Sequence, residues 1–259
     1  MRIWYQSYTR IGFDPKWKNI ENHLTRHIQR VARPDTEVDI YGVEKMSPKL
    51  TESGYIQLMH LSQVVENALK AERKGYDAFC LGGTLDLGHS ILREILDIPV
   101  AFILESSLYQ ACLFGTKFAI ISLNEMMLQR QMELVKFYGL ESRIVPSEHL
   151  NWTMTDFLEL LEKSPQSVID AFTETAKKVI GRGVGALIPG FGPLGSFFGE
   201  RGFHEIEDIP IVDIIGSVIK TAETLVDLSK MGIKRSRKGV YSYATKEELM
   251  AARRLYGVE

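Results

Sequence analysis

The sequence predicts an α/β fold of two similar, pseudo-symmetric lobes, each a parallel sheet flanked by helices. Short apolar runs alternate along the chain with longer runs of helical periodicity, such as residues 54–74 and 165–180. This alternation is typical of parallel strands joined by crossover helices. The chain also repeats itself once, weakly, at a distance of about half its length. One sheet in each repeat is therefore expected.

Eight of the short runs are predicted strands. Nearly all of their residues are apolar, as expected for strands that helices cover on both faces. In chain order the predicted strands are Arg2–Gln6, Glu37–Tyr41, Ala78–Leu81, Val100–Ile103, Phe118–Ser122, Ser142–Pro146, Ala186–Ile188 and Ile211–Val212.

The internal repeat predicts where a ligand binds. Residues 66–83 align with residues 174–191, and each copy reads as a helix, a glycine, a strand and a glycine-rich tip. Ligands of open parallel sheets bind beyond the carboxyl ends of the strands. We therefore expect a cleft between the two tips, in which Gly83 faces Phe191. The lobes are predicted at residues 1–115 together with 217–259, and at residues 116–216.

Charge and hydropathy exclude two classes of partner. The 259 residues include 31 basic and 33 acidic side chains, for a net charge of −2, so no nucleic-acid partner is expected. The short basic run at residues 230–238 is interpreted as a solvated loop. No apolar segment has the length of a membrane span and the N-terminus has no signal core, so we predict a cytoplasmic protein without a membrane partner.

Cysteine and histidine usage gives no sign of a metal site. Cys80 and Cys112 cannot form a disulfide framework or a four-ligand zinc site, and both lie in apolar runs, so they are predicted to be core thiols. His23 and His27 are one helical turn apart, but no acidic residue or cysteine recurs at metal-site spacing. No metal is expected.

Several short motifs recur in an order and spacing that carry a family resemblance. They are Gly75-Tyr76-Asp77-Ala78-Phe79, Asp86-Leu87-Gly88, Ile98-Pro99-Val100, Glu105-Ser106-Ser107, Gly115-Thr116-Lys117-Phe118, Tyr138-Gly139-Leu140 and Ile209-Pro210-Ile211-Val212-Asp213. With them the chain resembles the aspartate/glutamate racemase superfamily, nearest to its hydantoin racemase branch. The resemblance implies no cofactor and one cysteine at each strand tip, the two acting as paired acid and base on opposite faces of a substrate α-carbon. Related enzymes are often oligomers, so a homo-oligomer is one expectation.

The chain departs from this family at the two cysteine positions, which Gly83 and Phe191 occupy. Neither residue can transfer a proton. Cys80 lies three residues before Gly83 and has the opposite side-chain parity, and Cys112 lies in a helical run. The residues present therefore contradict a two-cysteine mechanism. The arylmalonate decarboxylases of this superfamily resemble the first lobe, because they have glycine followed by threonine, as in Gly83-Thr84, but they keep the second cysteine.

The strand tips are suited to binding a small anion. Gly83 and Thr84 in the first lobe, and Gly190, Phe191 and Gly192 in the second, bring backbone N–H groups and helix N-termini to one place. Thr84 is either a ligand contact or a helix cap. Further candidates for substrate binding, each with internal hydrogen bonding as the alternative, are Tyr5, Gln6, Ser7, Ser122 and Asn124.

Three residues of the first lobe are candidates for proton transfer: Asp86, His89 and Glu105. Asp86 is alternatively the N-cap of the helical stretch at residues 88–95, and His89 is alternatively a solvent-facing helix residue. Glu105 is alternatively an anion in the first turn of the next helix. The glycines of residues 190–195 also resemble a dinucleotide-binding fingerprint, but the internal repeat explains them without a nucleotide.

These observations predict a cofactor-independent enzyme that acts on a small carboxylate, amide or cyclic imide through an enolate-like or oxyanion intermediate. Because both cysteines are missing, we expect divergence from racemisation towards lyase, decarboxylase or hydrolase chemistry. One alternative is a true amino-acid or hydantoin racemase with acid and base residues other than cysteine. The other is a non-catalytic protein that binds a small molecule.

Overall fold

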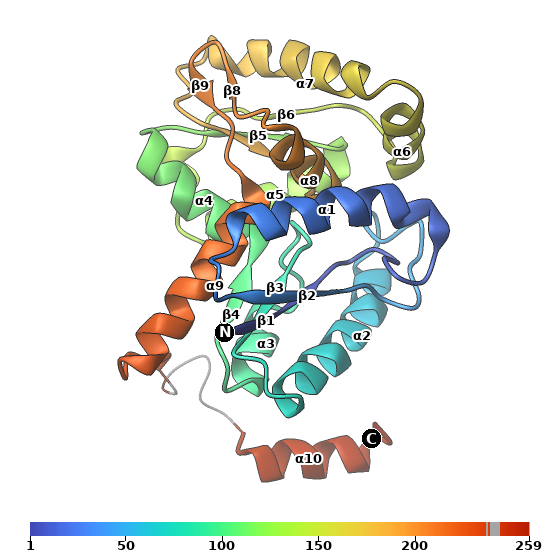
Figure 1. Cartoon of the computed structure of the whole chain (residues 1–259), viewed down its shortest axis with the longest axis vertical. Coiled ribbons are helices and arrows are strands. Elements are labelled where there is room, and N and C mark those ends of the chain that lie inside the picture. Colours follow the sequence, from blue (N-terminus) through green and yellow to red (C-terminus); the bar gives the residue numbers. More distant parts are fainter. Residues whose placement is uncertain (237, 239–243, 259) are drawn as a thin grey trace.

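The computed structural model describes residues 1–236, 238 and 244–258, and in it the chain forms two parallel sheets with helices around them (Figure 1). Part of the lobe predicted to include residues 217–259, and Arg237 of the basic run, lie outside the described residues. The predicted α/β class with two parallel sheets is confirmed.

The first sheet has four parallel strands in the order β2-β1-β3-β4. The strands are β1 (Arg2–Gln6), β2 (Glu37–Tyr41), β3 (Ala78–Leu81) and β4 (Val100–Phe102). Because they are parallel, their carboxyl ends all point to one edge, and Gln6 lies opposite Leu81 at that edge. The helices between these strands are α1 (Lys18–Val31), α2 (Gly54–Arg73) and α3 (His89–Ile95).

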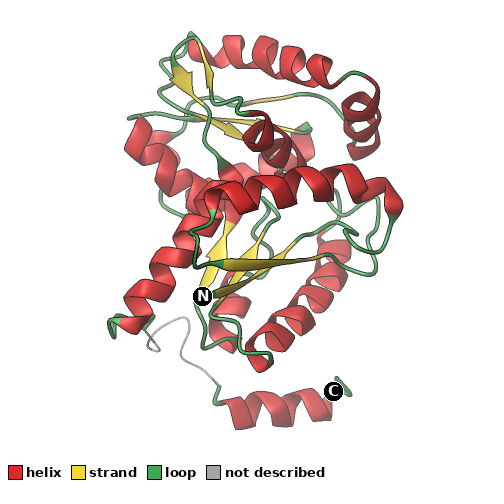
Figure 2. Cartoon of the chain, in the orientation of Figure 1, coloured by secondary structure: helices red, strands yellow, loops and turns green. Residues whose placement is uncertain are grey.

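The second sheet has three parallel strands in the order β6-β5-β7. Its strands are β5 (Ala119–Ser122), β6 (Glu148–His149) and β7 (Leu187–Pro189), and its helices are α5 (Glu125–Phe137), α6 (Met154–Lys163), α7 (Pro165–Ile180) and α8 (Gly192–Arg201). Two short strands, β8 (Glu205–Ile206) and β9 (Ile209–Pro210), form an antiparallel hairpin beyond α8 (Figure 2).

Two of the predicted strands are wrong in detail. Within Ser142–Pro146 only Ile144 pairs with Phe118, and the residues before it form a 3-10 helix, Glu141–Arg143. Pro146 has no N–H, and the hydroxyl of Ser147 accepts the N–H of Ile120 in place of a strand carbonyl, so regular pairing resumes only in β6. The predicted strand Ile211–Val212 is reduced to a single bridge between Ile211 and Leu187.

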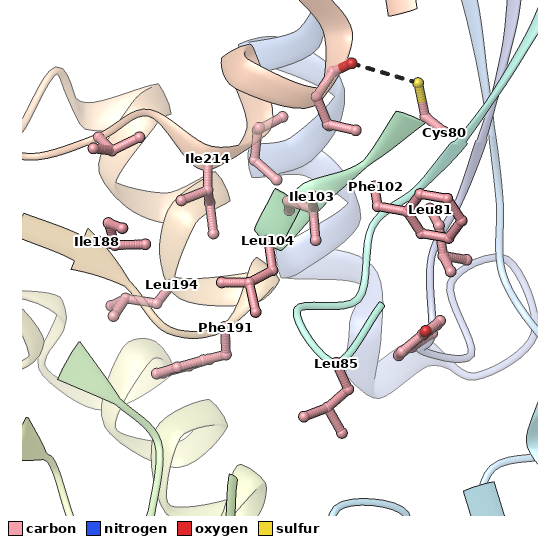
Figure 3. Close-up of a cluster of buried hydrophobic side chains, with 14 of the residues drawn as sticks. Cys80, Leu81, Leu85, Phe102, Ile103, Leu104, Ile188, Phe191, Leu194 and Ile214 are labelled. Carbon is pink, nitrogen blue, oxygen red and sulfur yellow. Dashed lines mark hydrogen bonds between the residues drawn. The ribbon is translucent and has the colours of Figure 1, made fainter. Parts of the chain in front are cut away.

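Two helices carry the chain between the sheets. Helix α4 (Ile103–Phe114) leads from β4 to the second sheet, and α9 (Ile214–Lys230) returns from it to pack against β3, β4 and α4. The last helix, α10 (Lys246–Leu255), lies apart from both sheets in Figure 1. The side chains of Phe102 in β4 and Leu104 in α4 pack with those of Ile188, Leu194 and Ile214 in one buried cluster (Figure 3).

The packing of the helices holds the two strand tips against each other. Helix α1 lies along α8 and α9, and its His27 Nε2 is 2.8 Å from the Asp213 carboxylate at the start of α9. A Cβ added to Gly192 would lie 2.8 Å from the carbonyl oxygen of Gly82, so the tips are in backbone contact. The expectation that the two glycine-rich tips meet is therefore confirmed.

Candidate functional site

A cavity of about 70 Å³ lies where the two tips meet. This is several times the roughly 10–15 Å³ that one water molecule needs. Residues of both tips line it, together with side chains that follow β1 and apolar side chains from both lobes. The polar lining comes from Tyr5, Ser7, Tyr8, Thr9, Thr51, Thr84 and Ser196. No aspartate, glutamate, lysine, arginine or histidine is among the described residues that line it.

A larger cleft of about 910 Å³ lies outside this cavity. The two spaces share only Met46 and Met154 among their described lining residues, one from each lobe. The cleft, unlike the cavity, is lined by charged side chains of both signs, such as Lys16 and Glu159. The described lining of the cavity is therefore uncharged, whereas the neighbouring cleft is lined by charged side chains.

Both tips contribute residues with unpaired backbone N–H groups to the lining of the cavity. Gly82 still donates its N–H to Gln6, and Gly190 still donates to Ile121. Beyond these glycines the strands stop pairing, and in the described part of the chain the N–H groups of Gly83, Thr84 and Leu85 have no protein acceptor. The same holds for the N–H groups of Phe191 and Gly192, at the start of α8. Such groups can bind a carboxylate or an oxyanion.

Aromatic rings fill the space beside both expected cysteine positions. A Cβ on Gly83 would lie 2.0 Å from Cδ2 of Tyr8, whose hydroxyl accepts the N–H of Leu87 at 2.6 Å. Phe191 is 1 % exposed, and its ring packs edge-on against Phe157 with the ring centroids 5.0 Å apart. A side chain at residue 83 therefore requires the Tyr8 ring to move.

Thr84 joins the two tips. Its hydroxyl donates to the carbonyl oxygen of Gly190 at 2.7 Å and accepts from Nε2 of Gln131 at 3.1 Å. The hydroxyl bonds between the tips and is not a helix cap, and a ligand contact of Thr84, which lines the cavity, stays a prediction. Gln131 was not predicted, although the sequence carries a signal for it: it is the polar member of the buried face of α5, between Met127 and Val135.

The Tyr5 hydroxyl is a free donor at the edge of the cavity. It has no hydrogen-bond partner among the residues that the structure describes, and it lies beside the backbone of Gly82, where an added Cβ would be 2.2 Å from it. Burial, and then the Cys80 thiol and the Asp213 carboxylate, raise the pKa of Tyr5. The phenol is therefore protonated at neutral pH and can donate to a ligand.

Among the other predicted binding residues, Gln6, Ser7 and Asn124 have internal side-chain partners, whereas the buried hydroxyl of Ser122 has none among the described residues. The amide of Gln6 donates to the carbonyl oxygens of Ser7 and Gly42, and it does not line the cavity. The hydroxyl of Ser7 lines the cavity and lies 2.8 Å from the hydroxyl of Thr9. Asn124 caps α5 by accepting the N–H of Met127. Neither Asn124 nor Ser122, which is fully buried, lines the cavity.

The three residues predicted to transfer protons form a cluster that does not line the cavity. Glu105 accepts hydrogen bonds from Arg93 at 2.5 and 2.9 Å, and its Oε1 lies 3.2 Å from Nε2 of His89. Burial opposes ionisation of Glu105, but the hydrogen bonds from His89 and Arg93 outweigh it and hold its pKa below the ordinary value. His89 is 8 % exposed and packs against Phe102, so it does not face solvent.

Asp86 caps a different helix from the predicted one. The N-cap of α3 is Gly88, and the carboxylate of Asp86 accepts the N–H groups of Leu104 and Glu105 in the first turn of α4. The hydroxyl of Tyr138 also donates to it. Burial outweighs these three hydrogen bonds and raises the pKa of Asp86 to about 7. An acid or base role for Asp86, His89 or Glu105 stays a prediction.

Comparison with known proteins identifies the family. The family model described as Asp/Glu/Hydantoin racemase matches residues 19–222. The chain belongs to the Asp/Glu/hydantoin racemase family. It is 28 % identical over 227 residues to a hydantoin racemase from Pseudomonas sp. (strain NS671), covering 87 % of each chain. It is 21 % identical over 205 residues to a hydantoin racemase from Paenarthrobacter aurescens, covering 78 % of this chain and 83 % of the relative.

Solved structures agree with this racemase-family fold. An allantoin racemase from Klebsiella pneumoniae superimposes with a TM-score of 0.78 at 19 % identity, covering 95 % of this chain and 94 % of the other. A mutant of arylmalonate decarboxylase in its liganded form superimposes with a TM-score of 0.59 at 14 % identity, covering 87 % and 92 %. Within the described part of this racemase-family chain, no group of three or more histidine, cysteine or acidic side chains could hold a metal ion. None of the described helices has the length and hydropathy of a membrane span.

Proposed function

We propose that this member of the racemase family is a cofactor-independent enzyme that binds a small carboxylate, amide or cyclic imide in the cavity between its tips. One observation carries the proposal: the residues with unpaired N–H groups, Gly83, Thr84, Phe191 and Gly192, and the free Tyr5 hydroxyl belong to one cavity, whose described lining residues are all uncharged. Fixed donors around a substrate oxygen stabilise the negative charge that develops on it, as in an enolate or a tetrahedral oxyanion. The names of the relatives support a cyclic imide or ureide as the substrate.

The lining also favours one kind of reaction. Removal of an α-proton needs a base, and the described lining contains no thiol, carboxylate or imidazole. Decarboxylation, which requires the carboxylate class of substrate and not a cyclic imide or ureide, needs no such base: the C–C bond to the carboxylate breaks, CO₂ leaves, and the electron pair forms the enolate. The enolate carbon then takes a proton, for which the Tyr5 hydroxyl is our candidate donor, and the tyrosinate takes a proton back from water before the next turnover. We therefore favour a lyase over a two-base racemase, and Glu105, Asp86 and His89 do not enter this step.

A second candidate function is binding of a small molecule without turnover. It is supported by the same lining, in which Tyr5 and Tyr8 are the titratable side chains among the described residues. Burial raises the pKa of both, so neither is ionised at neutral pH and neither can act as a base. A cavity of this kind can hold a ligand and leave it unchanged.

Proton NMR in D₂O separates these candidates. The purified protein is incubated with 5-substituted hydantoins, allantoin, amino acids, cyclic imides and arylmalonates. We expect new product signals, and these would identify a lyase or hydrolase. Loss of an α-proton signal from an intact compound would instead show racemase chemistry. A panel that stays unchanged while one compound raises the melting temperature would show binding alone.

A variant pair assigns any activity to the cavity. Tyr5→Phe removes the free hydroxyl and keeps the ring, and Tyr55→Phe makes the same change at a tyrosine that is 71 % exposed. Activity that falls in both variants, or in neither, would remove the Tyr5 hydroxyl from the reaction.

A further inference from the structure

We propose that Asp86 is a positioning residue, whose carboxylate holds the turn that presents the N–H groups of Gly83, Thr84 and Leu85 to the cavity. The consequence for ligand binding rests on the proposed function, but the positioning is a property of the free protein. Asp86 does not line the cavity, so it acts through this turn and not by contact with a ligand.

The side chain of Asp86 ties the turn to both lobes. Its Oδ1 accepts the N–H of Leu104 at 3.1 Å, and its Oδ2 accepts the N–H of Glu105 at 2.9 Å, both in α4. The hydroxyl of Tyr138, which follows α5 of the second sheet, donates to Oδ2 at 2.8 Å. Asp86 is 2 % exposed, so water cannot replace these donors without a rearrangement.

The backbone of Asp86 closes the same turn. Its N–H donates to the carbonyl oxygen of Gly83 at 3.0 Å, and its own carbonyl oxygen accepts the N–H of His89 at 3.2 Å. Its φ angle is +41°, in the left-handed region that residues with a side chain seldom adopt. Such a conformation persists only when the surrounding contacts determine it, and the three side-chain hydrogen bonds supply them.

Four other polar groups set the charge of Asp86. Glu105 of α4 and Tyr8, which follows β1, interact with its charge through space. Tyr138 donates a hydrogen bond to it, and Arg93 of α3 neutralises the charge of Glu105. The ionised carboxylate can accept all three donors, and the protonated carboxyl offers fewer acceptor sites. Because the pKa of Asp86 is raised to about 7, the turn is held best above neutral pH.

Amide hydrogen exchange tests the positioning without a ligand. The Leu87 N–H is bonded to the Tyr8 hydroxyl and not to Asp86, so its exchange reports on the turn as a whole. We expect Asp86→Asn to speed Leu87 exchange about ten-fold at pH 8. The substitution replaces one of the two side-chain oxygens by an NH₂ group, which cannot accept a hydrogen bond. If Asp86→Asn does not fold, Tyr138→Phe removes a single donor and should speed the same exchange about three-fold.

Glu200→Gln is the matched control. Glu200 is also a carboxylate between the lobes, accepting from Arg26 at 2.9 Å and lying 3.2 Å from Nδ1 of His23, but it contacts α1 rather than the turn. We expect Glu200→Gln to leave Leu87 exchange within about two-fold of wild type. Two results would overturn the proposal: equal acceleration of Leu87 exchange in Asp86→Asn and Glu200→Gln, or no acceleration in Asp86→Asn and Tyr138→Phe.

Titration of acetate into ¹⁵N-labelled protein then links the turn to binding. We expect acetate to shift the Gly83, Thr84 and Leu85 amide signals, and its dissociation constant to rise about five-fold in Asp86→Asn but not in Glu200→Gln. An equal dissociation constant for acetate in wild type and Asp86→Asn would contradict the positioning role. No acetate shift in wild type would count against the proposed function, and Leu87 exchange would still decide the role of Asp86.

Discussion

The hydroxyl of Thr84 donates a hydrogen bond of 2.7 Å to the carbonyl oxygen of Gly190, and this bond joins two tips that lie 106 residues apart in the chain. Nε2 of Gln131 donates to both of these oxygens, at 3.1 and 2.5 Å. All three residues are buried. The two lobes are therefore connected at the cavity itself and not only along their outer helices.

Thr84→Val should weaken this connection. Valine has nearly the shape of threonine, but it leaves the Gly190 carbonyl with Gln131 as its donor and Gln131 without the Thr84 acceptor. We expect the free energy of unfolding to fall by about 1–2 kcal/mol, as measured by urea denaturation. Thr155→Val, at an exposed position of α6, is the control and should change it little. Equal effects at the two sites would show that the bond contributes nothing specific.

Gly83→Ala should destabilise the fold, because the new methyl group would overlap the Tyr8 ring, with Cδ2 at 2.0 Å. We expect a loss of about 1–3 kcal/mol in the free energy of unfolding. Gly54→Ala is the control, since a Cβ there meets no atom within 4 Å. In a double-mutant cycle, Tyr8→Ala should remove most of the added cost of Gly83→Ala. If the stability losses of Gly83→Ala and Tyr8→Ala simply add in the double variant, the Tyr8 ring is not what excludes a side chain at residue 83.

Glu105→Gln separates a catalytic from a structural role. Glu105 accepts from half-buried Arg93 but does not line the cavity, so the variant should lose about 1–3 kcal/mol of stability and keep its turnover. Turnover per folded molecule is measured beside a urea denaturation curve. Glu174→Gln, on an exposed part of α7, is the control for removal of a charge. Loss of turnover in a folded Glu105→Gln protein would restore Glu105 as the base.

His60 should make the protein sensitive to mild acid. Burial lowers the pKa of His60 to about 4, whereas an unfolded histidine titrates near 6.5. Between these two values the unfolded state binds more protons than the folded state, so stability falls as the pH falls through this window. From pH 7 to pH 5 the loss from His60 is about 2 kcal/mol.

The matched variants for this effect are His60→Leu and His204→Leu. His60→Leu should lose about 2 kcal/mol less than wild type between pH 7 and pH 5 in urea denaturation. His204 is exposed, so His204→Leu should follow the wild-type curve. An unchanged pH dependence in His60→Leu would mean that other groups cause the acid sensitivity.

The sequence predicted the sheets and the tips because both are local patterns. The alternation of apolar strands with helices, and the glycines near residues 83 and 190, can be recognised within short windows. It could not predict that the Tyr8 ring covers Gly83, since that contact spans 75 residues and depends on side-chain packing. Asp86 shows the same limit. An acidic residue before a helix reads as a cap, but the helix that it caps begins 17 residues later.

The chain crosses between the sheets twice, through α4 and α9, and these two helices pack together. In Figure 1 they lie on the side of the molecule away from α6, whose Met154 borders both the inner cavity and the outer cleft. The two covalent crossings between the lobes therefore lie on one side of the molecule, and Met154, which the cavity and the cleft share with Met46, lies on the other. The two side chains that border both spaces are flexible thioethers, so a change of rotamer at Met46 or Met154 reshapes the cavity and the cleft together.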